Sequence, residues 1–311
     1  MKPDSPAIST GVLTTEAVNP NSAQIDTLSP HDIVRLMNAE DSTIAAAVAA
    51  ETESIAGAIE VITDRLSNNG RLIYIGAGTS GRFGVLDASE CPPTFNTPPE
   101  LVVGVIAGGD SALRRSAESV EDHPERGAED LKGVGLTSRD VVVGIATSGR
   151  TPYVIGAMEC ARSVGAFAIG LACNEGSALS KTADLMITPI TGPEIISGST
   201  RMKAGTATKM ILNMLTTGTM VQLGKTYGNL MVDLRATNTK LVARSRRLMA
   251  SLTGLSEIQA EAELVKCGGE LKTAVVMIRR GVSVDTARDI LRSCNQQLRR
   301  ALDETADGAS L

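Results

Sequence analysis

Aromatic side chains are scarce in this chain, which has three Tyr, three Phe and no Trp among 311 residues. Nucleic-acid bases are commonly held by stacking on aromatic rings, so the sequence has little material for that kind of binding. The charge points the same way, because 30 Lys and Arg against 35 Asp and Glu give a net charge of −5. Nucleic-acid-binding domains normally carry a basic balance. We therefore expect no nucleic-acid partner.

Residues that bind metals are also few. The chain has two His and five Cys, and no two Cys stand at C-x-x-C spacing. A structural zinc site needs such ligands in clusters. An odd, scattered set of Cys is typical of reduced thiols. We expect no metal ion and a cytoplasmic location.

Long apolar runs are missing as well. No stretch approaches the ~20 apolar residues that a membrane-spanning helix requires. Residues 1–30 are rich in Ser, Thr, Pro and Asn and lack the apolar region of a signal peptide. We expect no membrane partner and no signal peptide. With 42% hydrophobic and 21% charged residues, the chain has enough apolar material for a substantial core.

Short apolar runs alternate with helical patterns or Gly-rich loops through the middle of the chain. Five runs have the length and composition of buried strands: Arg71–Ile75, Leu101–Ala107, Asp140–Ala146, Ala166–Ala172 and Asp184–Ile190. Strands that alternate with helices favour a parallel sheet covered on both faces. The sequence therefore predicts an α/β protein, an αβα sandwich around a five-stranded parallel sheet. No strand pattern is evident after Ile190.

Helical patterns flank the predicted sheet on both sides. Ile55, Ile59, Ile62 and Leu66 fall on one helical stripe, and residues 199–220 and everything after Leu234 also have helical patterns. We expect three parts: an N-terminal irregular and helical segment (1–61), the α/β domain (62–225) and a small C-terminal helical bundle (235–311).

The C-terminal region is basic. Residues 235–300 carry thirteen Lys and Arg against six Asp and Glu, a balance of +7, so the rest of the chain carries −12. Solvated helix faces explain this charge, as does docking on the acidic domain of a partner subunit. A nucleic-acid-binding arm is the less favoured explanation.

Three loops rich in Gly, Ser and Thr follow predicted strands or precede a helix. They are Gly76-Ala-Gly-Thr-Ser-Gly-Arg82, Thr147-Ser-Gly-Arg-Thr151 and Ser197-Gly-Ser-Thr-Arg-Met-Lys203. Such loops allow backbone N–H groups and hydroxyls to converge on an anion at a helix N-terminus. Because ligands of open α/β sheets collect at the carboxyl ends of the strands, we expect the three loops to form one anion site.

These loops do not match either of two common nucleotide-binding motifs in full. Gly76, Gly78 and Gly81 have the G-x-G-x-x-G spacing of a dinucleotide fingerprint, but the next predicted strand ends in Gly108-Gly109 rather than in an acidic residue. A P-loop is excluded, because G-x-x-x-x-G-K-[ST] does not occur.

Two glutamates are candidates for acid–base catalysis. Glu90 and Glu121 each end a helical pattern shortly before proline, at Pro92 and Pro124. If proline ends each helix, both carboxyl groups lie near a helix C-terminus, where the helix dipole disfavours the anion. A general acid needs such a shift toward neutral pH. A solvated carboxylate near a helix end is the alternative for each residue.

Four strings make the sequence recognisable. Ile75-Gly-Ala-Gly-Thr-Ser-Gly-Arg82, Leu86-Asp-Ala-Ser-Glu-Cys-Pro-Pro-Thr-Phe95, Gly149-Arg-Thr-Pro-Tyr-Val154 and Ser199-Thr-Arg-Met-Lys-Ala-Gly-Thr206 resemble the N-acetylmuramic acid 6-phosphate etherase family. This family belongs to the sugar isomerase (SIS) superfamily. The resemblance runs from Leu13-Thr-Thr-Glu16 to the C-terminal helices.

The resemblance implies a lyase without cofactors, active in cell-wall amino sugar recycling. Such enzymes cleave the ether between D-lactate and C3 of N-acetylmuramic acid 6-phosphate. Ring opening exposes the C1 aldehyde, which acidifies the hydrogen on C2. A base removes this hydrogen, lactate leaves from C3, and water adds to the unsaturated aldehyde. Carboxyl groups suffice for these proton transfers, so no metal or nucleotide is implied.

The resemblance also assigns roles to residues. It implies that Glu90 is the catalytic acid and Glu121 its partner, although Glu118 is one helical turn from Glu121 and could be confused with it. It places the phosphate on Gly78, Thr79, Ser80, Gly81, Ser148, Gly149 and Thr151. Ser199, Thr200, Arg150 and Lys203 are further possible contacts, with a purely structural role as the alternative for Arg150 and Lys203. Thr147 adds a hydroxyl to the second loop.

Two other functions stay open within the superfamily. A regulator that binds sugar phosphates without catalysis would need neither glutamate, and an aldose–ketose isomerase need not carry the Ser-Glu-Cys-Pro-Pro string. The apolar helix faces of a single SIS domain, together with the pairing usual in the superfamily, lead us to expect a two-fold symmetric homodimer.

Overall fold

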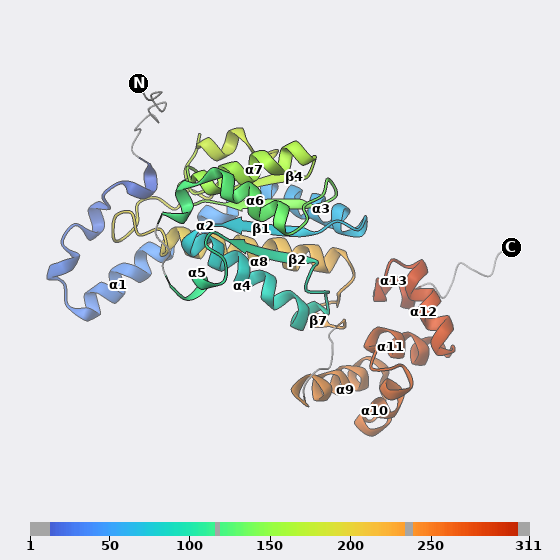
Figure 1. The fold of residues 1–311 in the computed structure, drawn as a ribbon. Helices are drawn as coiled ribbons and strands as arrows, with labels where there is room; N and C mark the ends of the chain where they lie inside the picture. The colour runs from blue at the N-terminus through green and yellow to red at the C-terminus, as the bar shows by residue number, and fades with distance from the viewer. Residues whose placement is uncertain (1–12, 116–118, 234–238, 304–311) are drawn as a thin grey trace.

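The computed structural model describes residues 13–115, 119–233 and 239–303, which form an α/β domain followed by a helical bundle (Figure 1). The strands of the large sheet are β1 (Leu72–Gly76), β2 (Val102–Ile106), β3 (Val141–Ile145), β4 (Phe167–Leu171) and β5 (Leu185–Ile187). They are all parallel and have the order β2-β1-β3-β4-β5. The predicted five-stranded parallel sheet is confirmed.

Side chains along each strand alternate between two hydrophobic clusters. Leu72 and Tyr74 belong to the cluster on one face, whereas Ile73 and Ile75 belong to the cluster on the other. The first face is covered by α2 (Ile44–Ala49), α3 (Thr52–Ser67), α4 (Gly78–Phe95) and α8 (Lys203–Gln222), and the second by α6 (Pro124–Gly133) and α7 (Pro152–Val164). The αβα layers are therefore also confirmed.

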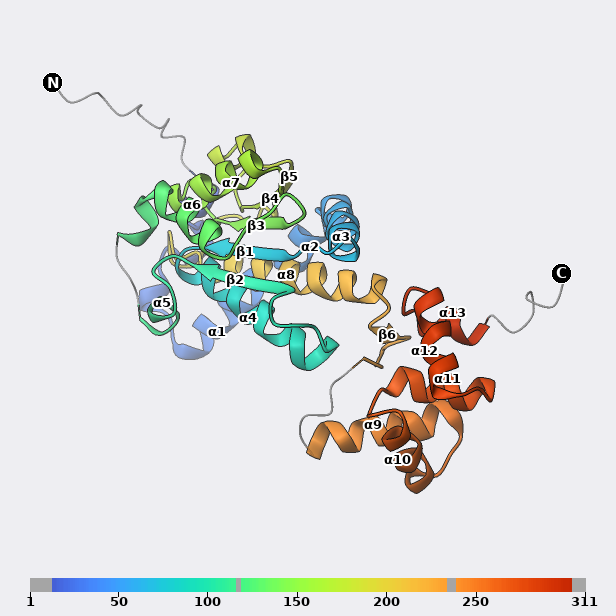
Figure 2. The same ribbon diagram turned by 45° about the vertical axis from the view of Figure 1, so that its right-hand side comes forward.

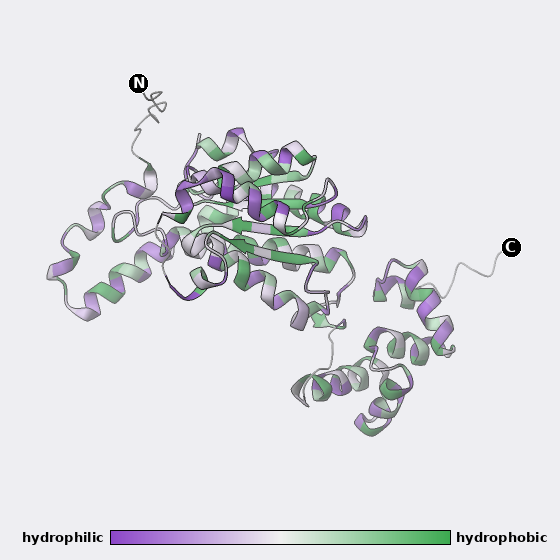
Figure 3. Ribbon diagram, viewed as in Figure 1, coloured by the Kyte–Doolittle hydropathy of each residue, from purple (hydrophilic) through white to green (hydrophobic). Residues whose placement is uncertain are grey.

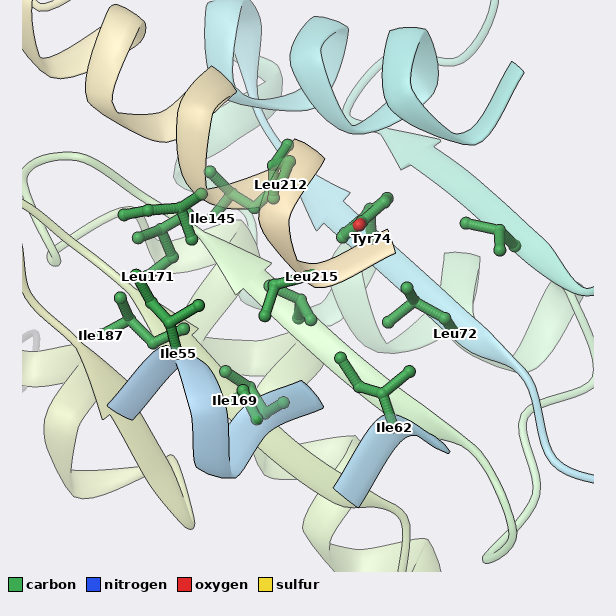
Figure 4. Close-up of a cluster of buried hydrophobic side chains, with 14 of the residues drawn as sticks. Ile55, Ile62, Leu72, Tyr74, Ile145, Ile169, Leu171, Ile187, Leu212 and Leu215 are labelled. Carbon is green, nitrogen blue, oxygen red and sulfur yellow. The ribbon is translucent and has the colours of Figure 1, made fainter. Parts of the chain in front are cut away.

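The stripe read from the sequence is the buried face of α3. Ile55 and Ile62 point from α3 toward the sheet, beside Leu212 and Leu215 of α8 (Figure 4). Figure 3 shows the same separation over the whole molecule, with hydrophobic strands inside and helices of mixed polarity outside.

Between residues 13 and 41, the described part of the N-terminal segment forms three short 3₁₀ turns and one helix. They are η1 (Thr14–Glu16), η2 (Pro20–Ser22), η3 (Ile25–Thr27) and α1 (Pro30–Asp41). The Ser22 hydroxyl donates to the Ile195 carbonyl at 2.7 Å, which fixes this segment to the loop that precedes α8.

A β-hairpin that the sequence reading missed leads into the C-terminal bundle. Its strands are β6 (Thr226–Tyr227) and β7 (Leu230–Met231), so the expectation of no strand after Ile190 was wrong. Two-residue strands carry too little pattern to be recognised. The helices after residue 234 are confirmed as α9 (Thr239–Thr253), α10 (Glu257–Lys266), α11 (Leu271–Arg280), α12 (Val284–Ser293) and α13 (Leu298–Asp303).

The bundle has a hydrophobic cluster of its own, to which Val232 and helices α9 to α13 contribute. Lys225 and Lys272 both lie 3.0 Å from the carboxylate of Asp233, beside the hairpin. In Figure 2 the bundle lies beyond the amino ends of the strands, at the end of the domain away from α1. The predicted division into residues 1–61, 62–225 and 235–311 remains a prediction. Its first boundary, between residues 61 and 62, falls within α3.

None of the described helices combines the length and the hydrophobicity that crossing a membrane requires.

Candidate functional site

The candidate site lies where the chain reverses direction across the sheet. From β1 the chain moves outward to β2 through α4 and then returns past β1 to β3, which pairs with β1. The loops that follow β1 and β3 therefore leave the sheet side by side. This switch point is where open α/β sheets bind their ligands.

The loop after β1 leads directly into α4. The helix begins at Gly78, and Ala77 at the N-cap position supplies no side-chain acceptor to the first turn. The first N–H groups of the helix are therefore left for an anion, which the helix dipole also favours. Gly78 has φ +54°, a left-handed conformation that glycine adopts readily. Thr79 and Ser80 add hydroxyls at the same point.

The loop after β3 is held by close packing against Ser177. Gly149 has φ +66°, and a Cβ atom there would lie 2.2 Å from Cβ of Ser177. The Ser148 hydroxyl accepts the Arg150 N–H at 3.2 Å, which orders the turn.

Two of the N–H groups expected to bind phosphate are already used by the backbone. The Gly81 N–H donates to the Ala77 carbonyl at 3.3 Å, and the Gly149 N–H donates to the Ala146 carbonyl at 2.7 Å. The amides of these two glycines are therefore already bonded within the loops, and their contribution to phosphate binding stays a prediction.

The third loop differs from the other two because α8 already has an anion at its N-terminus. The carboxylate of Glu194, which is fully buried, accepts the N–H groups of Lys203 and Ala204, each at 2.9 Å. The helix begins at Lys203 rather than at Ser199, so the predicted start was four residues early. Two of the first N–H groups of this helix are therefore already bonded within the chain, and a role of the third loop in binding the ligand anion stays a prediction.

Lys203 faces away from the candidate ligand. Its side chain is 3% exposed, and its Nζ lies 2.7 Å from Oε2 of Glu40. Of the two roles considered for Lys203, contact with the ligand or a purely structural role, this geometry favours the structural one. Arg150 and Ser199 do not line the cavity.

One cavity of about 230 Å³ unites the parts that remain. It is lined by Glu16, Ala77, Gly78, Thr79, Ser80, Phe83, Glu121, Thr147, Ser148, Thr151, Thr200, Gly205 and Thr208. Six threonine and serine hydroxyl groups of the predicted loops, those of Thr79, Ser80, Thr147, Ser148, Thr151 and Thr200, thus share one space. Sites for whole small molecules usually occupy ~300–1,000 Å³, so this cavity suits the phosphate end of a larger ligand.

Glu121 lines the cavity, but from a different local structure than the one expected. It belongs to η4 (Val120–Asp122), a 3₁₀ turn directly before α6, whose first residue is Pro124. Pro124 begins a helix here instead of ending one, so the argument from a helix C-terminus was wrong. Glu118 lies outside the described residues.

Glu90 is exposed and does not line the cavity of its own chain. Helix α4 continues through Pro92 and Pro93 to Phe95, so the expectation that proline ends this helix was also wrong. Cys91 and Phe95 are buried in the core, and this packing outweighs the loss of backbone hydrogen bonds near the helix end. Glu90 follows Gly78 by twelve residues, or about 18 Å along a helix.

A buried polar network fixes α4 to its neighbours. Asp87 accepts hydrogen bonds from the Tyr74 hydroxyl of β1 at 3.0 Å and from the Asn213 amide of α8 at 2.7 Å. Burial raises the pKa of Asp87 despite these bonds. The network fixes the helix that carries both the first loop and Glu90.

The cysteines near the site are not nucleophiles. Burial, and to a smaller extent the Glu194 carboxylate, raise the pKa of the Cys173 thiol to about 12. Burial raises the pKa of the Cys91 thiol to about 12 as well, with smaller effects from Asp87 and Glu90. A thiol reacts as its thiolate, which neither residue forms near neutral pH. Among the described residues, no three His, Cys, Asp or Glu are grouped as a metal site would require.

Four residues that line the cavity were not singled out from the sequence. Phe83 is on α4, and Gly205 and Thr208 are on α8, two and five residues from its start. Glu16 comes from η1, far from the strand loops in sequence. The string Leu13-Thr-Thr-Glu16 was noted as part of the resemblance, but no pattern connected it to the loops.

Comparison with family models defines the class of protein. Residues 54–162 match the model of the glucokinase regulatory protein N-terminal SIS domain, and residues 127–218 match the SIS domain model. The structure of a phosphoheptose isomerase from Francisella tularensis has a TM-score of 0.51 and 21% identity, and covers 62% of this chain and 100% of that protein. The α/β domain therefore has the SIS fold.

Curated relatives are much more similar over the whole chain. An N-acetylmuramic acid 6-phosphate etherase of Rhodopirellula baltica is 62% identical over 93% of this chain and 96% of the relative. Relatives of the same name from Streptomyces avermitilis and Vibrio cholerae are 56% and 51% identical over 93% and 94% of this chain, and over 93% and 97% of their own lengths. The chain belongs to the N-acetylmuramic acid 6-phosphate etherase family.

Proposed function

We propose that this protein cleaves the D-lactyl ether of N-acetylmuramic acid 6-phosphate, giving N-acetylglucosamine 6-phosphate and D-lactate, in amino sugar recycling. The observation that carries the proposal is the cavity at the switch point. It combines an uncapped helix N-terminus and several hydroxyls, which suit a phosphate, with the carboxylate of Glu121, which suits proton transfer. Family membership supplies the identity of the sugar.

In this proposal the phosphate end of the substrate is bound by the loops, and the sugar end reacts. The phosphate binds at the N-terminus of α4, on the hydroxyls of Thr79, Ser80, Ser148 and Thr151, and Gly78 contributes its backbone. Thr147 and Thr200 line the same space. The opened sugar chain then extends toward Glu121, which removes the C2 hydrogen. Lactate leaves from C3 when its oxygen takes a proton, and water adds across the C2–C3 double bond.

Glu90 is the proton donor in this proposal, and it acts on the site of a second chain. About 18 Å of helix separate it from the start of α4, so it cannot reach the substrate that its own α4 binds. Leu86, one turn before Glu90, is 51% exposed on α4. A two-fold symmetric homodimer that covers this part of α4 would bring Glu90 of each chain to the cavity of the other.

Release of D-lactate tests the proposal. The purified protein should release D-lactate from N-acetylmuramic acid 6-phosphate and leave the unphosphorylated sugar intact. Activity should survive treatment with EDTA and need no added NAD. Equal turnover of both sugars would contradict a phosphate-binding cavity, and a divalent ion that restored activity after chelation would contradict proton transfer by carboxyl groups alone.

The match to a regulatory SIS domain favours a second candidate, a sugar-phosphate-binding regulator without catalysis. This candidate predicts binding of the sugar phosphate and no release of D-lactate. An aldose–ketose isomerase would likewise release none. We place the protein in the cytoplasm, since its five cysteines are all free and buried, as suits a reducing compartment.

A further inference from the structure

The cavity contains a carboxylate that the proposed mechanism does not use. Glu16 lines it together with the loops after β1 and β3. Glu16 belongs to η1, in the N-terminal segment, and is separated from β1 by more than fifty residues. The candidate site therefore includes a side chain from outside the SIS domain.

Asn174 fixes η1 to the loop that follows β3. Its Oδ1 accepts hydrogen bonds from the Thr14 hydroxyl at 3.0 Å and from the Thr15 N–H at 3.4 Å. Its amide donates to the Thr15 hydroxyl at 3.1 Å and to the Thr147 carbonyl at 2.9 Å. Thr15 is fully buried and Asn174 is 2% exposed. Thr15, the residue before Glu16, is thus held by a buried hydrogen-bond network that also holds the loop after β3.

The Glu16 carboxylate has no hydrogen bond or ion pair to any described residue, whereas two carboxylates near the start of α8 are bonded. Glu40 is bonded to Lys203, and Glu194 to the first turn of α8. Glycine at position 198 leaves room for the Glu16 side chain, because a Cβ atom there would lie 2.9 Å from Oε2 of Glu16. Glu16 is exposed, so an acceptor group at the cavity wall has no partner among the described residues.

A carboxylate in this place opposes binding of phosphate alone, because the two like charges repel each other. Its presence is favourable only if the ligand brings hydrogen-bond donors. The sugar part of a sugar phosphate carries such donors in its hydroxyl and amide N–H groups.

We propose that Glu16 is a specificity-determining residue, which accepts hydrogen bonds from the hydroxyl or amide N–H groups of the sugar. The cavity then selects a sugar phosphate over free phosphate. This inference rests on the proposed function only in taking a sugar phosphate as the ligand, and it needs no catalytic step.

Calorimetric binding of two probes tests the role of Glu16. In Glu16→Gln, binding of N-acetylglucosamine 6-phosphate should weaken by about 10-fold, since the neutral amide oxygen of Gln is a weaker acceptor than the carboxylate. Binding of inorganic phosphate should stay the same or become tighter, because a repulsive charge is removed. Asp26→Asn is the matched control: it removes an exposed carboxylate from the same segment, outside the cavity, and should change neither affinity.

Equal weakening of both probes in Glu16→Gln would overturn the inference, and so would unchanged affinity for the sugar phosphate. Thr14→Val gives a second measure, because the Thr14 hydroxyl positions η1 through its bond to Asn174 and is not itself bonded to the loop after β3. It should cause the same selective loss, and combining it with Glu16→Gln should add little. Independent, additive losses would show that the position of η1 does not act through Glu16 and would count against the inference. If the wild type binds the sugar phosphate but releases no D-lactate, the proposed function fails while this test remains decisive.

Discussion

The buried ammonium group of Lys203 lies 2.7 Å from the carboxylate of Glu40, and this pair connects the start of α8 to α1. Glu40 also accepts hydrogen bonds from the side-chain amides of Asn19 and Asn21. Burial by itself raises the pKa of Glu40, but the bonds from Lys203, Asn21 and Asn19 outweigh it and hold the pKa below its ordinary value. The Glu40 carboxylate thus connects α1 to the start of α8 and to the segment that contains Asn19 and Asn21.

Lys203→Met should destabilise the protein by about 3 kcal/mol, because removing one partner of a buried ion pair leaves the other charge uncompensated. Urea unfolding would measure the loss. The double variant Glu40→Gln with Lys203→Met removes both charges and should recover part of the lost stability. A single variant as stable as the wild type would show that the pair contributes nothing.

Gly149→Ala should destabilise the protein by about 2 to 4 kcal/mol, since it adds both an unfavourable φ and an overlap with Ser177. Gly176→Ala is the control. Gly176 has φ +60°, and nothing lies within 4 Å of an added Cβ atom. Only the backbone cost of about 1 kcal/mol applies there. Thermal or urea unfolding of the two variants should separate these effects, and equal losses would contradict the close packing at Ser177.

Asp140→Asn should reduce stability in a manner that depends on pH. Burial alone raises the pKa of Asp140, but hydrogen bonds from the Arg71 side chain, the Thr137 N–H and the Arg71 N–H outweigh it and lower the pKa. A carboxyl group with a lowered folded-state pKa contributes stability above its unfolded pKa of about 3.9 and loses it as pH falls through the folded value.

The free energy of unfolding of Asp140→Asn should therefore lie about 2 kcal/mol below that of the wild type at pH 7. The difference should decrease as the pH is lowered below about 4. Urea unfolding at a series of pH values would measure it. A difference that grew toward acid pH would reverse the assigned direction of the shift.

Glu90→Gln and Glu121→Gln should each reduce release of D-lactate by about 10² to 10⁴, the usual contribution of general acid–base catalysis. Exchange of the C2 hydrogen with solvent deuterium should separate them. Glu121→Gln should slow this exchange, whereas Glu90→Gln should permit it without ether cleavage. Glu118→Gln is the control for the neighbouring glutamate, and a crippled Glu118 variant beside an active Glu121 variant would reassign the role.

Mixing the two inactive variants tests whether Glu90 acts across a subunit interface. In a mixed dimer one site would hold both native glutamates, so an equal, randomly exchanged mixture should recover about a quarter of wild-type activity. If both glutamates acted within one chain, every site would lack one of them and no activity would return. A fully active monomer in light scattering would also contradict the arrangement.

The strands of the sheet and most residues that line the cavity could be predicted, because both depend on local sequence patterns. The run Leu72–Gly76 is apolar throughout, and the glycines and hydroxyl residues that follow it lie at the carboxyl end of the strand. The helix ends were harder to predict, because burial of Phe95 carries α4 through two prolines. The N-terminus of α8 was misread since its anion, Glu194, comes from a loop nine residues earlier.

Glu16 could not be placed from the sequence for a similar reason. Its position depends on bonds between Asn174 and the preceding Thr14 and Thr15, across about 160 residues. Contacts between segments so far apart in the chain leave no periodicity or spacing that could be recognised in the sequence. The position of Glu90 outside its own chain's cavity likewise becomes evident only once the continuous length of α4 is known.

If Glu16 contacts the sugar as proposed, the double role of Asn174, bonded to both η1 and the Thr147 carbonyl, would link ligand affinity to docking of the N-terminal segment. A ligand that contacts Glu16 binds only the docked form, so its apparent dissociation constant rises in inverse proportion to the docked fraction. By reciprocity, bound sugar phosphate must shift the segment toward docking by the same free energy. Amide hydrogen exchange at Thr15 and Glu16 should therefore slow when the sugar phosphate binds, and inorganic phosphate should slow it less.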